Sequence, residues 1–498
     1  MHYVSLIVEF LRGRPSVMFW LAALLQAALW TLVPALFYSA PPGDVPLVLA
    51  IGHEFQLGSY LGPPLAFWLG ELAFRAAGSL GVYVLAQACV VLTYWAVFRL
   101  GRAIVGTRHA VLAVLLMAGI AAFALPSVDF GPATMATPLW ALALLHYWRS
   151  VGEDKRGYWF LLAVDLGLLL LASYVGLILL VLMIAFTPLI TGGRQALRHP
   201  EPWVALLLLV IVVFPYAWWA LGDRDLIVSG LEDAAGDRLS PALWLVGALI
   251  ATHLGLGLLV GLAIWPRQRR SRPPEVYRNP VEPLARRFVY VFAVAPALVA
   301  VVIAALSRHL GPMDHIAPFV VLSGLAVIVS TGDRLLLYRE NLLSSAWLGL
   351  LVAPPALVAA GLIALPWLPG VDPRVAQPAK AEGRFFAESY ERRIGKPLEY
   401  VTGDPRVAPL VAIGAPSRPH VYFAWAPDRS PWASADDMRT HGGVIVWLDT
   451  ATGVAPEPLK ALFPDMVPEV PRSFERPMQG LLPLVRLGWS VMRPQAAP

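Results

Sequence analysis

The sequence predicts a mainly α-helical, polytopic integral membrane protein with a small α/β domain at its C-terminal end. Charged residues make up 14% of the 498 residues and hydrophobic residues 58%, whereas a soluble protein carries about a quarter of charged residues. Apolar runs that are long enough to cross a bilayer follow one another up to residue 368. Beyond that point proline and charged residues become frequent and these runs stop, which indicates a separate domain.

The apolar runs predict about eleven membrane crossings, because one crossing needs about 20 apolar residues. Single helices are expected at 16–38, 82–98, 109–125, 131–148, 203–221, 241–265, 288–307, 316–332 and 343–368. The run at 157–190 is too long for one helix, and we expect two shorter helices that turn near Ser173-Tyr174. The first run is longer than the apolar core of a signal peptide, which predicts a retained membrane helix.

Basic residues predict the orientation of these helices. If the N-terminus is cytoplasmic, the loops expected outside carry few basic residues, namely Arg75, Arg224, Arg238 and Arg308. The loops expected inside carry many, including the Arg- and Pro-rich connection 266–287, which we expect to contact anionic lipid and not nucleic acid. This positive-inside bias supports two helices within 157–190, because a single helix there would reverse every later loop.

The sequence divides into a membrane domain at 1–369 and a smaller α/β domain at 370–498. In the smaller domain, an amphipathic helix is expected at 378–394, ending at Gly395, and strands are expected at 398–404, 419–425 and 443–449. An odd number of crossings places this domain outside the cytoplasm, on the side of the loop at 43–75. The single cysteine, Cys89, lies in an apolar run, so no disulfide is expected to stabilise the exposed domain.

The loop at 43–75 concentrates polar residues between two apolar runs. Carboxylates close to hydrocarbon are costly, so a functional role is the first hypothesis for them. The candidate residues are Asp44, His53, Glu54, Gln56, Tyr60, the Pro63-Pro64 pair, Trp68 and Glu71.

Asp44 suits two roles. It can be the N-cap of a short interfacial helix with Pro46 in its first turn, or a general base toward a sugar or lipid hydroxyl. If 45–57 were helical, Glu54 would lie ~15 Å from Asp44 by helix rise, too far for the carboxylate pair of a retaining glycosidase.

Three further outer loops carry candidate residues. Asp129, in the segment PSVDFGP, has the chemistry of a turn residue, but its place on the same face as Asp44 predicts a shared site. The loop 223–238 is acidic, and is either solvated or shapes a ligand mouth.

The fourth outer loop contains Arg308, His309, Asp314 and His315. A His-Asp-His set suits a divalent metal, yet one loop supplies too few ligands. No metal ligand is therefore assigned, and a divalent metal is left open as a cofactor.

Several stretches carry a resemblance to a known family. Asp44 is followed by residues 52–68, which read GHEFQLGSYLGPPLAFW, and residues 127–137 are followed by Leu139-Trp140-Ala141. This order resembles the bacterial GT-C-fold membrane glycosyltransferases related to protein O-mannosyltransferases (glycosyltransferase family 39) and to the aminoarabinose and galacturonic acid transferases of lipid A. Gly403-Asp404 and Ser430-Pro431-Trp432 resemble the outer domain of one proteobacterial branch.

The resemblance implies an inverting glycosyltransferase at the periplasmic face of the bacterial inner membrane. Its donor would be a sugar linked to a polyprenyl phosphate, and its acceptor a hydroxyl of a lipid of the lipid A or lipopolysaccharide type, or of a protein. Asp44 would act as the base, and Asp129 is the second catalytic candidate. The expected substrate-binding residues are His53, Glu54, Gln56, Tyr60, Pro64, Trp68, Tyr174 and Arg308. Membrane lipids are expected partners, and no nucleotide site is required, because no Gly-rich phosphate loop is present.

The chain departs from the family's pattern at positions that bear positive charge. Many relatives place a Lys and a His just before the proline pair, where this chain has Leu61 and Gly62, and often a Lys where it has Ser173. A departing lipid phosphate favours cationic partners. We therefore expect outer-loop arginines to replace them, from the set Arg75, Arg224, Arg238 and Arg308.

Two other classes of function stay open at this point. One is a diverged homologue that binds or assembles partners with little activity of its own. The other is a lipid or small-solute transporter, for which ionisable residues within several spans and inverted repeats are typical. Asp165 is the clearest acid within a span, and no repeat is visible.

Overall fold

The computed structural model describes residues 13–125, 128–232, 240–264, 275–277, 280–307, 315–331, 334–336, 340–368, 371, 373–448, 454–478 and 480–495. The chain folds into two compact units. Unit 1 comprises Met1–Leu32, Leu61–Leu65 and Tyr83–Leu357, and unit 2 comprises Val33–Tyr60, Ala66–Val82 and Val358–Pro498. Most of the predicted polar loop therefore belongs to the same unit as the C-terminal residues, while the expected boundary at residue 369 stays a prediction.

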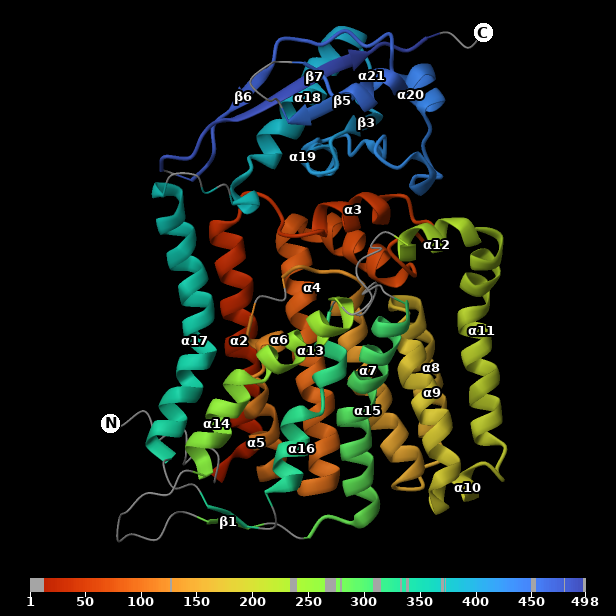
Figure 1. The fold of residues 1–498 in the computed structure, drawn as a ribbon, viewed down its shortest axis with the longest axis vertical. Coiled ribbons are helices and arrows are strands. Elements are labelled where there is room, and N and C mark those ends of the chain that lie inside the picture. The colour runs from red at the N-terminus through yellow and green to blue at the C-terminus, as the bar shows by residue number, and fades with distance from the viewer. Residues whose placement is uncertain are drawn as a thin grey trace. The chain divides into compact units, whose positions relative to one another are not determined.

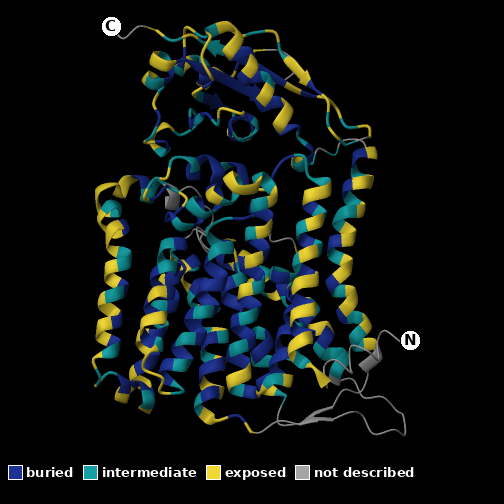
Figure 2. Cartoon of the chain, turned by 180° about the vertical axis from the view of Figure 1, so that it is seen from behind, coloured by how far each residue is buried: buried dark blue, intermediate teal, exposed yellow. Residues whose placement is uncertain are grey.

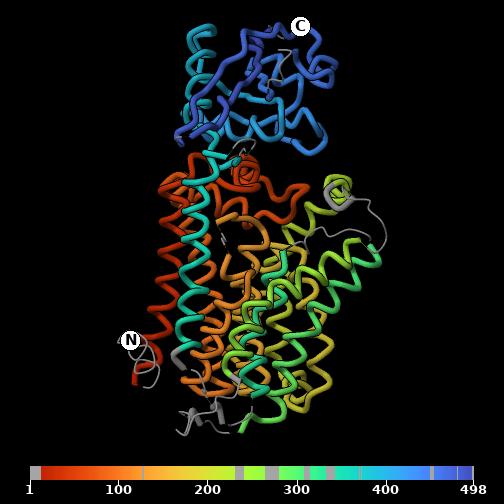
Figure 3. The backbone as a smooth tube through the Cα atoms, turned by 60° about the vertical axis from the view of Figure 1, so that its left-hand side comes forward, coloured from red at the N-terminus to blue at the C-terminus, as the bar shows by residue number. Residues whose placement is uncertain are grey.

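Unit 1 consists mainly of helices, and most of its long helices run roughly in one direction (Figures 1 and 3). Long apolar stretches favour helices in a membrane because a helix satisfies its own backbone polar groups. The helices are α2 (Pro15–Phe37), α4 (Leu65–Val105), α5 (Thr107–Met117), α6 (Ala121–Ala124), α7 (Pro132–Val151), α8 (Tyr158–Ala172), α9 (Gly176–Phe186), η1 (Thr187–Leu189), α10 (Thr191–Ala196), α11 (Glu201–Gly222), α12 (Arg224–Glu232), α13 (Ser240–Thr252), α14 (Leu254–Ile264), α15 (Pro283–Ser307), η3 (Ala317–Val320), α16 (Ser323–Ser330) and α17 (Glu340–Ala364). Helices α2, α4 and α17 also contribute residues to unit 2. A short antiparallel pair joins β1 (Glu275–Tyr277) to β2 (Arg334–Leu336).

Aromatic side chains fill the core of unit 1, while its outer helices expose apolar ones. Tyr147 of α7 lies 5.8 Å from Phe292 of α15, measured between ring centroids, and Phe288 lies 5.0 Å from Phe292. On α11, by contrast, Trp218 is 70% exposed and Leu221 78% exposed, and exposed residues run along the outer helices in Figure 2. An apolar surface of this extent requires an apolar surrounding, as a membrane protein has.

Six helices among the described residues are long and apolar enough to cross a membrane by length and composition. They are Pro15–Phe37, Leu65–Val105, Glu201–Gly222, Ser240–Ala263, Pro283–Ser307 and Leu342–Trp367, and the shorter apolar helices are Thr107–Met117, Tyr158–Ala172, Gly176–Leu189 and Ala317–Ser330. The prediction of two helices in 157–190 is confirmed by α8 and α9, because Ser173 between them is extended (φ −161°, ψ 145°). The total of eleven crossings stays a prediction.

The expected span 82–98 lies in the part of α4 that follows an interruption at Ala77 and Gly78, whereas the first part of α4 begins at Leu65, inside the expected loop. Pro64 stands at its N-cap, where a proline is tolerated since the first helical amides have no partner in the helix. The helix is interrupted at Ala77 and at Gly78, whose φ of +61° suits a residue without a Cβ. Trp68 and Glu71, expected in a loop, are therefore helical residues.

Unit 2 contains a mixed sheet of five strands in the order β4-β3-β5-β7-β6. The strands are β3 (Tyr400–Gly403), β4 (His420–Tyr422), β5 (Gly443–Leu448), β6 (Arg472–Phe474) and β7 (Val485–Met492). β3 pairs in parallel with β4 and β5, whereas β7 pairs antiparallel with β5 and β6. The three predicted strands are confirmed, and β6 and β7 were not predicted.

The helices of unit 2 are α3 (Val45–His53), the first part of α4, η4 (Leu365–Trp367), η5 (Arg374–Ala376), α18 (Ala379–Ile394), α19 (Ala408–Gly414), η6 (Pro427–Arg429), α20 (Ala435–His441) and α21 (Glu457–Leu462). The predicted helix at 378–394 is confirmed by α18, which ends at Gly395 in the left-handed conformation (φ 79°). The core joins Val48 and Ile51 of α3 with Phe67 of α4 and with Val411 of α19. This packing brings the N-terminal loop residues next to the chain that leads into β4.

Candidate functional site

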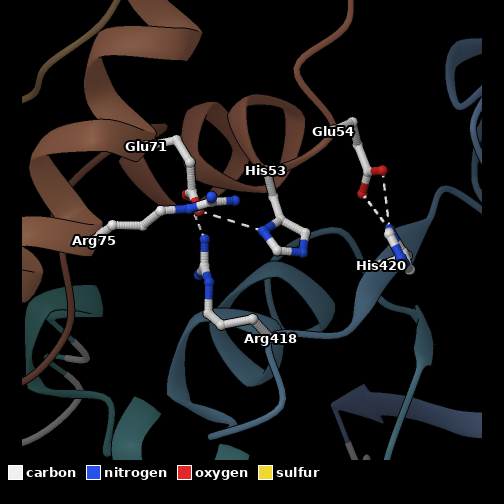
Figure 4. Close-up of polar contacts among 6 residues, drawn as sticks. All are labelled: His53, Glu54, Glu71, Arg75, Arg418 and His420. Carbon is white, nitrogen blue, oxygen red and sulfur yellow. Dashed lines mark hydrogen bonds and ion pairs between the residues drawn. The ribbon is translucent and has the colours of Figure 1, made fainter.

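A buried carboxylate, Glu71 of α4, gathers basic side chains from three segments of unit 2 (Figure 4). Arg75 lies one helical turn further along α4, and its Nε donates to Glu71 Oε1 at 2.9 Å. Arg418 Nη2 donates to Glu71 Oε2 at 2.5 Å, and His53 Nδ1 lies 3.3 Å from Glu71 Oε1. The Glu71 side chain is 0% exposed. The interactions with these partners therefore offset the free energy of desolvating its charge.

Arg418 reaches Glu71 from the turn that precedes β4. Its backbone has a φ of +51°, which is uncommon for a residue with a Cβ. Its guanidinium also lies over the ring of Phe74, 4.6 Å from the ring centroid. Burial lowers the pKa of Arg418, and the neighbouring Arg75 lowers it further, while Glu71 opposes both. Because an arginine pKa is far above neutrality, the side chain remains a cation.

A second ion pair links the same loop to β4. His420 Nδ1 lies 2.9 Å from both carboxylate oxygens of Glu54, and its ring centroid lies 5.5 Å from that of His53. The hydrogen bond to Glu54 raises the pKa of His420, although partial burial opposes the shift. The His420 side chain is 41% exposed, so a solvent-borne ligand can reach it.

The cluster, defined as His53, Glu54, Glu71, Arg75, Arg418 and His420, holds two guanidinium groups and two carboxylates, and its net charge becomes positive when His420 is protonated. Two guanidinium groups face the single carboxylate of Glu71, and Glu54 is matched by His420 when that ring is protonated. Arg75 is 51% exposed, so one of the two guanidinium groups can also contact a ligand. The arrangement is suited to holding an anion near α3.

Asp44 stands immediately before α3, at the position of its N-cap, and is exposed. The structure confirms the short helix with Pro46 in its first turn, but α3 ends at His53, so 45–57 is not helical throughout. The Asp44 side chain makes no capping hydrogen bond. Among the described residues, none caps its carboxylate, so a ligand hydroxyl can approach it.

The remaining candidates of unit 2 shape the loop that follows α3. Trp68 Nε1 donates to the carbonyl of Gln56 at 2.9 Å, which fixes that loop to α4. The Tyr60 ring meets Phe423 edge-on at 6.2 Å, and the Arg429 guanidinium lies 4.7 Å from the Tyr60 centroid. Tyr60, Gln56 and Trp68 are each partly exposed.

In unit 1, Asp129 lines a cavity of about 220 Å³ together with His315. Thr93, Thr134 and Thr137 add hydroxyl groups to the lining. The Thr134 hydroxyl donates to the Asp129 carbonyl at 3.0 Å, which holds the turn against the first residues of α7. The cavity is lined by a carboxylate, an imidazole and hydroxyls, a set that can bind a polar ligand by hydrogen bonds.

The other predicted residues of unit 1 lie elsewhere. Tyr174 forms a hydrogen bond of 2.6 Å with Tyr216, and Pro64 is buried at the start of α4. Asp165 is paired with His146 at 2.5 Å. Arg238, Arg308, His309 and Asp314 lie outside the described residues. Within the described ranges, no group of three or more His, Cys, Asp or Glu side chains is placed to hold a metal ion.

Arg418 and His420 are the cluster residues that sequence reasoning missed. Both flank the start of a predicted strand, in the order Arg418-Pro419-His420, and that position gave no local sign of charge pairing. Only the packing of α3 and α19 in one core places them beside Glu71 and Glu54. The arginines expected to replace the missing lysines belong to loops between membrane helices, which include Arg75 but not Arg418.

Comparison with known proteins gives a family match for part of the chain and a fold for nearly all of it. Residues 62–219 match the family model of dolichyl-phosphate-mannose-protein mannosyltransferases. ArnT from Cupriavidus metallidurans bound to undecaprenyl phosphate aligns with a TM-score of 0.55 at 14% identity, covering 97% of this chain and 99% of that one. The apo state of ArnT aligns with a TM-score of 0.51 at 12% identity and the same coverage. An oligosaccharyltransferase from Archaeoglobus fulgidus in the apo form aligns with a TM-score of 0.43 at 14% identity, over 81% of this chain and 64% of its own. None of the curated proteins matches in sequence.

These comparisons confirm the predicted resemblance at the level of fold and segment. The chain shares the mainly helical fold of ArnT over nearly its whole length. The segment that matches the mannosyltransferase model includes Trp68, Glu71, Asp129 and Tyr174. Asp44 and the residues of β4 lie outside that segment.

Proposed function

We propose that this chain is a membrane glycosyltransferase that moves a sugar from a polyprenyl-phosphate donor to a hydroxyl of a lipid or a protein. The observation that carries the proposal is the alignment over 97% of the chain with ArnT, whose structure holds undecaprenyl phosphate. The mannosyltransferase match at 62–219 supports a sugar donor linked to a lipid phosphate. The reaction would take place at the periplasmic face of a bacterial inner membrane, where the positive-inside bias orients the loop at 43–75.

Asp44 is the proposed base. It is exposed and makes no capping bond, so its carboxylate can accept a hydrogen bond from the acceptor hydroxyl. As that oxygen attacks the anomeric carbon, its proton passes to Asp44, and the bond between the anomeric carbon and the phosphate oxygen breaks. The lipid phosphate leaves with the electron pair of that bond, and the anomeric configuration inverts.

The charge that develops on the leaving phosphate needs positive partners. In this proposal Arg75 supplies one, because it is 51% exposed and shares Glu71 with a second guanidinium, that of Arg418. Protonated His420 supplies another, held by Glu54. These side chains would take the part of the Lys and His that relatives carry before the proline pair.

Asp129 is proposed to bind the polar portion of a substrate in the cavity that it lines with His315 and three threonines. Each threonine hydroxyl already donates to a backbone carbonyl, so its oxygen would accept a hydrogen bond from a sugar hydroxyl. A second catalytic role for Asp129 stays part of the proposal.

The test compares envelope lipids and proteins, by mass spectrometry, in cells with the gene, without it, and with an Asp44→Asn copy. The expected result is a lipid or protein whose mass falls by one sugar when the gene is deleted and is restored only by the native copy. Addition of a chelator to the purified enzyme with polyprenyl-phosphate sugar tests whether a divalent metal takes part. Identical envelope profiles in all strains, with the protein present in the membrane, would contradict a transferase.

A further inference from the structure

A second cavity of unit 1, of about 420 Å³, is lined almost entirely by apolar side chains. It lies between α8, α9 and α11, and α7 adds Tyr147 to its lining. The apolar lining includes Trp159, Leu166, Met183, Leu197, Trp203 and Leu209. A cavity of this size and chemistry accommodates an apolar ligand.

The two hydroxyl groups that line this cavity are hydrogen-bonded within the protein and do not require a polar ligand. Tyr147 Oη and Thr187 Oγ1 are hydrogen-bonded to each other at 2.8 Å, and Thr187 Oγ1 also donates to the Met183 carbonyl at 2.7 Å. Because these groups are already satisfied, the interior favours hydrocarbon over water or a sugar. The occupant must therefore place a hydrocarbon part in the cavity.

The cavity is accessible from the outer surface of the helices. Three of its lining residues are exposed as well: Ile184 is 61% exposed, Trp203 57% and Leu206 46%. In a helix bundle that spans a bilayer, such a surface faces lipid, so an acyl chain can enter sideways.

Three basic residues are close in sequence to residues that line one end of this cavity. Arg198 follows the lining residue Leu197, and Arg194 lies on α10 one turn earlier; both are exposed and form no ion pair with the described residues. Arg156 precedes α8, where its Nη2 lies 3.3 Å from His199 Nε2 and its Nη1 3.7 Å from Glu201 Oε1. The rim, defined as Arg156, Arg194 and Arg198, thus offers positive charge next to an apolar interior.

This cavity is separate from the one lined by Asp129. Asp129 precedes the first residue of α7, whereas Tyr147 lies fifteen residues beyond that first residue, roughly 22 Å along the helix axis. The rim residues also belong to loops that the positive-inside bias assigns to the cytoplasmic side, opposite to the loop of Asp129. Anionic head groups are abundant in that leaflet.

We propose that this cavity and its rim bind one anionic bilayer phospholipid, with an acyl chain between α8, α9 and α11 and its phosphate against Arg156, Arg194 and Arg198. The charge of the rim selects the head group, and the dry interior holds the chain. This lipid is a bound structural ligand and not the sugar donor, because its phosphate lies at the opposite end of α7 from Asp129.

The experiment measures lipid binding to the purified full-length chain by native mass spectrometry in a neutral detergent. Phosphatidylglycerol and phosphatidylcholine with identical acyl chains are the probes. The native protein is expected to bind phosphatidylglycerol about tenfold more tightly, which corresponds to about 1.4 kcal/mol, because the rim arginines attract an anionic head group. The double variant Arg194→Gln/Arg198→Gln is expected to lose that preference. The control Arg102→Gln/Arg108→Gln, which removes two exposed arginines elsewhere in unit 1, is expected to keep it.

A second variant tests the chain-binding part. Ala205→Phe fills the cavity from α11 and is expected to weaken the binding of both lipids. Leu207→Phe, at a residue of α11 that is 58% exposed, is expected to leave the binding of both lipids unchanged. Equal binding of the two lipids by the native protein would overturn the proposal, and so would equal losses in the rim variant and its control. Displacement of phosphatidylglycerol by inorganic phosphate alone would assign the rim to a free anion. Displacement by an equimolar polyprenyl phosphate would assign the cavity to the donor.

Discussion

Arg418 Nη2 lies 2.5 Å from Glu71 Oε2, although 347 positions separate the two residues in the chain. Glu71 is buried in α4 and Arg418 leads into β4, so this contact joins the N-terminal loop region of unit 2 to its C-terminal sheet. The same carboxylate also binds Arg75 and His53. The proposed anion site therefore depends on one buried acid that orders several cations.

Glu71→Gln is expected to destabilise unit 2 by about 3 kcal/mol, because it leaves the partly buried Arg418 without its counter-charge. Chemical unfolding of the purified protein in detergent measures the free energy of unfolding. Glu457→Gln is the control, since its partner Lys460 is in an exposed pair and Glu457 is 85% exposed. That control is expected to change stability by no more than about 0.5 kcal/mol. Equal stability of both variants would mean that the Glu71 cluster does not hold the unit together.

Arg75→Gln is expected to raise the KM for the polyprenyl-phosphate donor about tenfold, since a charge-assisted hydrogen bond to phosphate is lost. The fold is expected to persist because Arg418 still pairs with Glu71. Initial rates of sugar transfer in liposomes, at several donor concentrations, measure the effect. The matched control is Arg384→Gln, which removes an exposed arginine of α18 outside the cluster. An unchanged KM in both variants contradicts a role of Arg75 in donor binding.

Asp44→Asn is expected to abolish sugar transfer while the protein stays folded and membrane-inserted, because an amide cannot accept the acceptor's proton. Asp436→Asn, at a residue that is 87% exposed in unit 2, serves as the control and is expected to retain full activity. The readout is product formed per mole of folded protein, with folding checked by gel filtration in detergent. If Asp44→Asn keeps its activity, another group is the base.

His420 gives the fold a pH dependence of defined sign. The folded-state pKa is raised above the ordinary 6.5 by Glu54, so the stabilising pair is fully present below pH 6.5 and is lost as the pH rises through the folded-state pKa. Melting temperatures across this range are expected to fall with pH in the native protein. Glu54→Gln is expected to flatten that fall, and His441→Gln, at an exposed histidine of α20, to leave it unchanged. Because Glu382 is also expected to titrate in this range, the comparison is made in a Glu382→Gln background, where an equal fall with and without Glu54→Gln would contradict a role of the Glu54–His420 pair.

Glu382 of α18 is a second group whose titration makes the stability of the folded protein depend on pH. Burial raises its pKa from 4.5 to about 7, while Arg476 opposes the shift. Because the folded-state pKa is the higher one, stability is present below about pH 4.5 and is lost as the pH rises through about 7. Glu382→Gln is therefore expected to be the more stable protein at about pH 8, by up to about 3 kcal/mol at 1.36 kcal/mol per pKa unit, and equal to native near pH 4.5. Unfolding free energies at the two pH values measure this, and no gain at the higher pH contradicts it.

Local sequence patterns were sufficient to predict most helices and part of the sheet. The apolar runs predicted α2, α8, α9 and α11, because burial of an apolar stretch and backbone pairing within a helix depend on neighbouring residues only. Strand β7 was missed because Gly488 interrupts its pattern; a Cβ there would lie 2.2 Å from Trp447 Nε1, so the sheet packing requires a glycine.

The sequence by itself determined that this is a multi-pass membrane protein with a polar loop around Asp44, His53 and Glu54, and it carried the resemblance to GT-C glycosyltransferases. Only the tertiary structure decided which cations face that loop. Arg418 and His420 meet Glu71 and Glu54 through the packing of α3 against α19, and Asp129 meets His315 across a cavity. The physical reason is range: periodicity and capping act over a few residues, whereas charge pairing across hundreds of positions requires the folded core to bring the partners together.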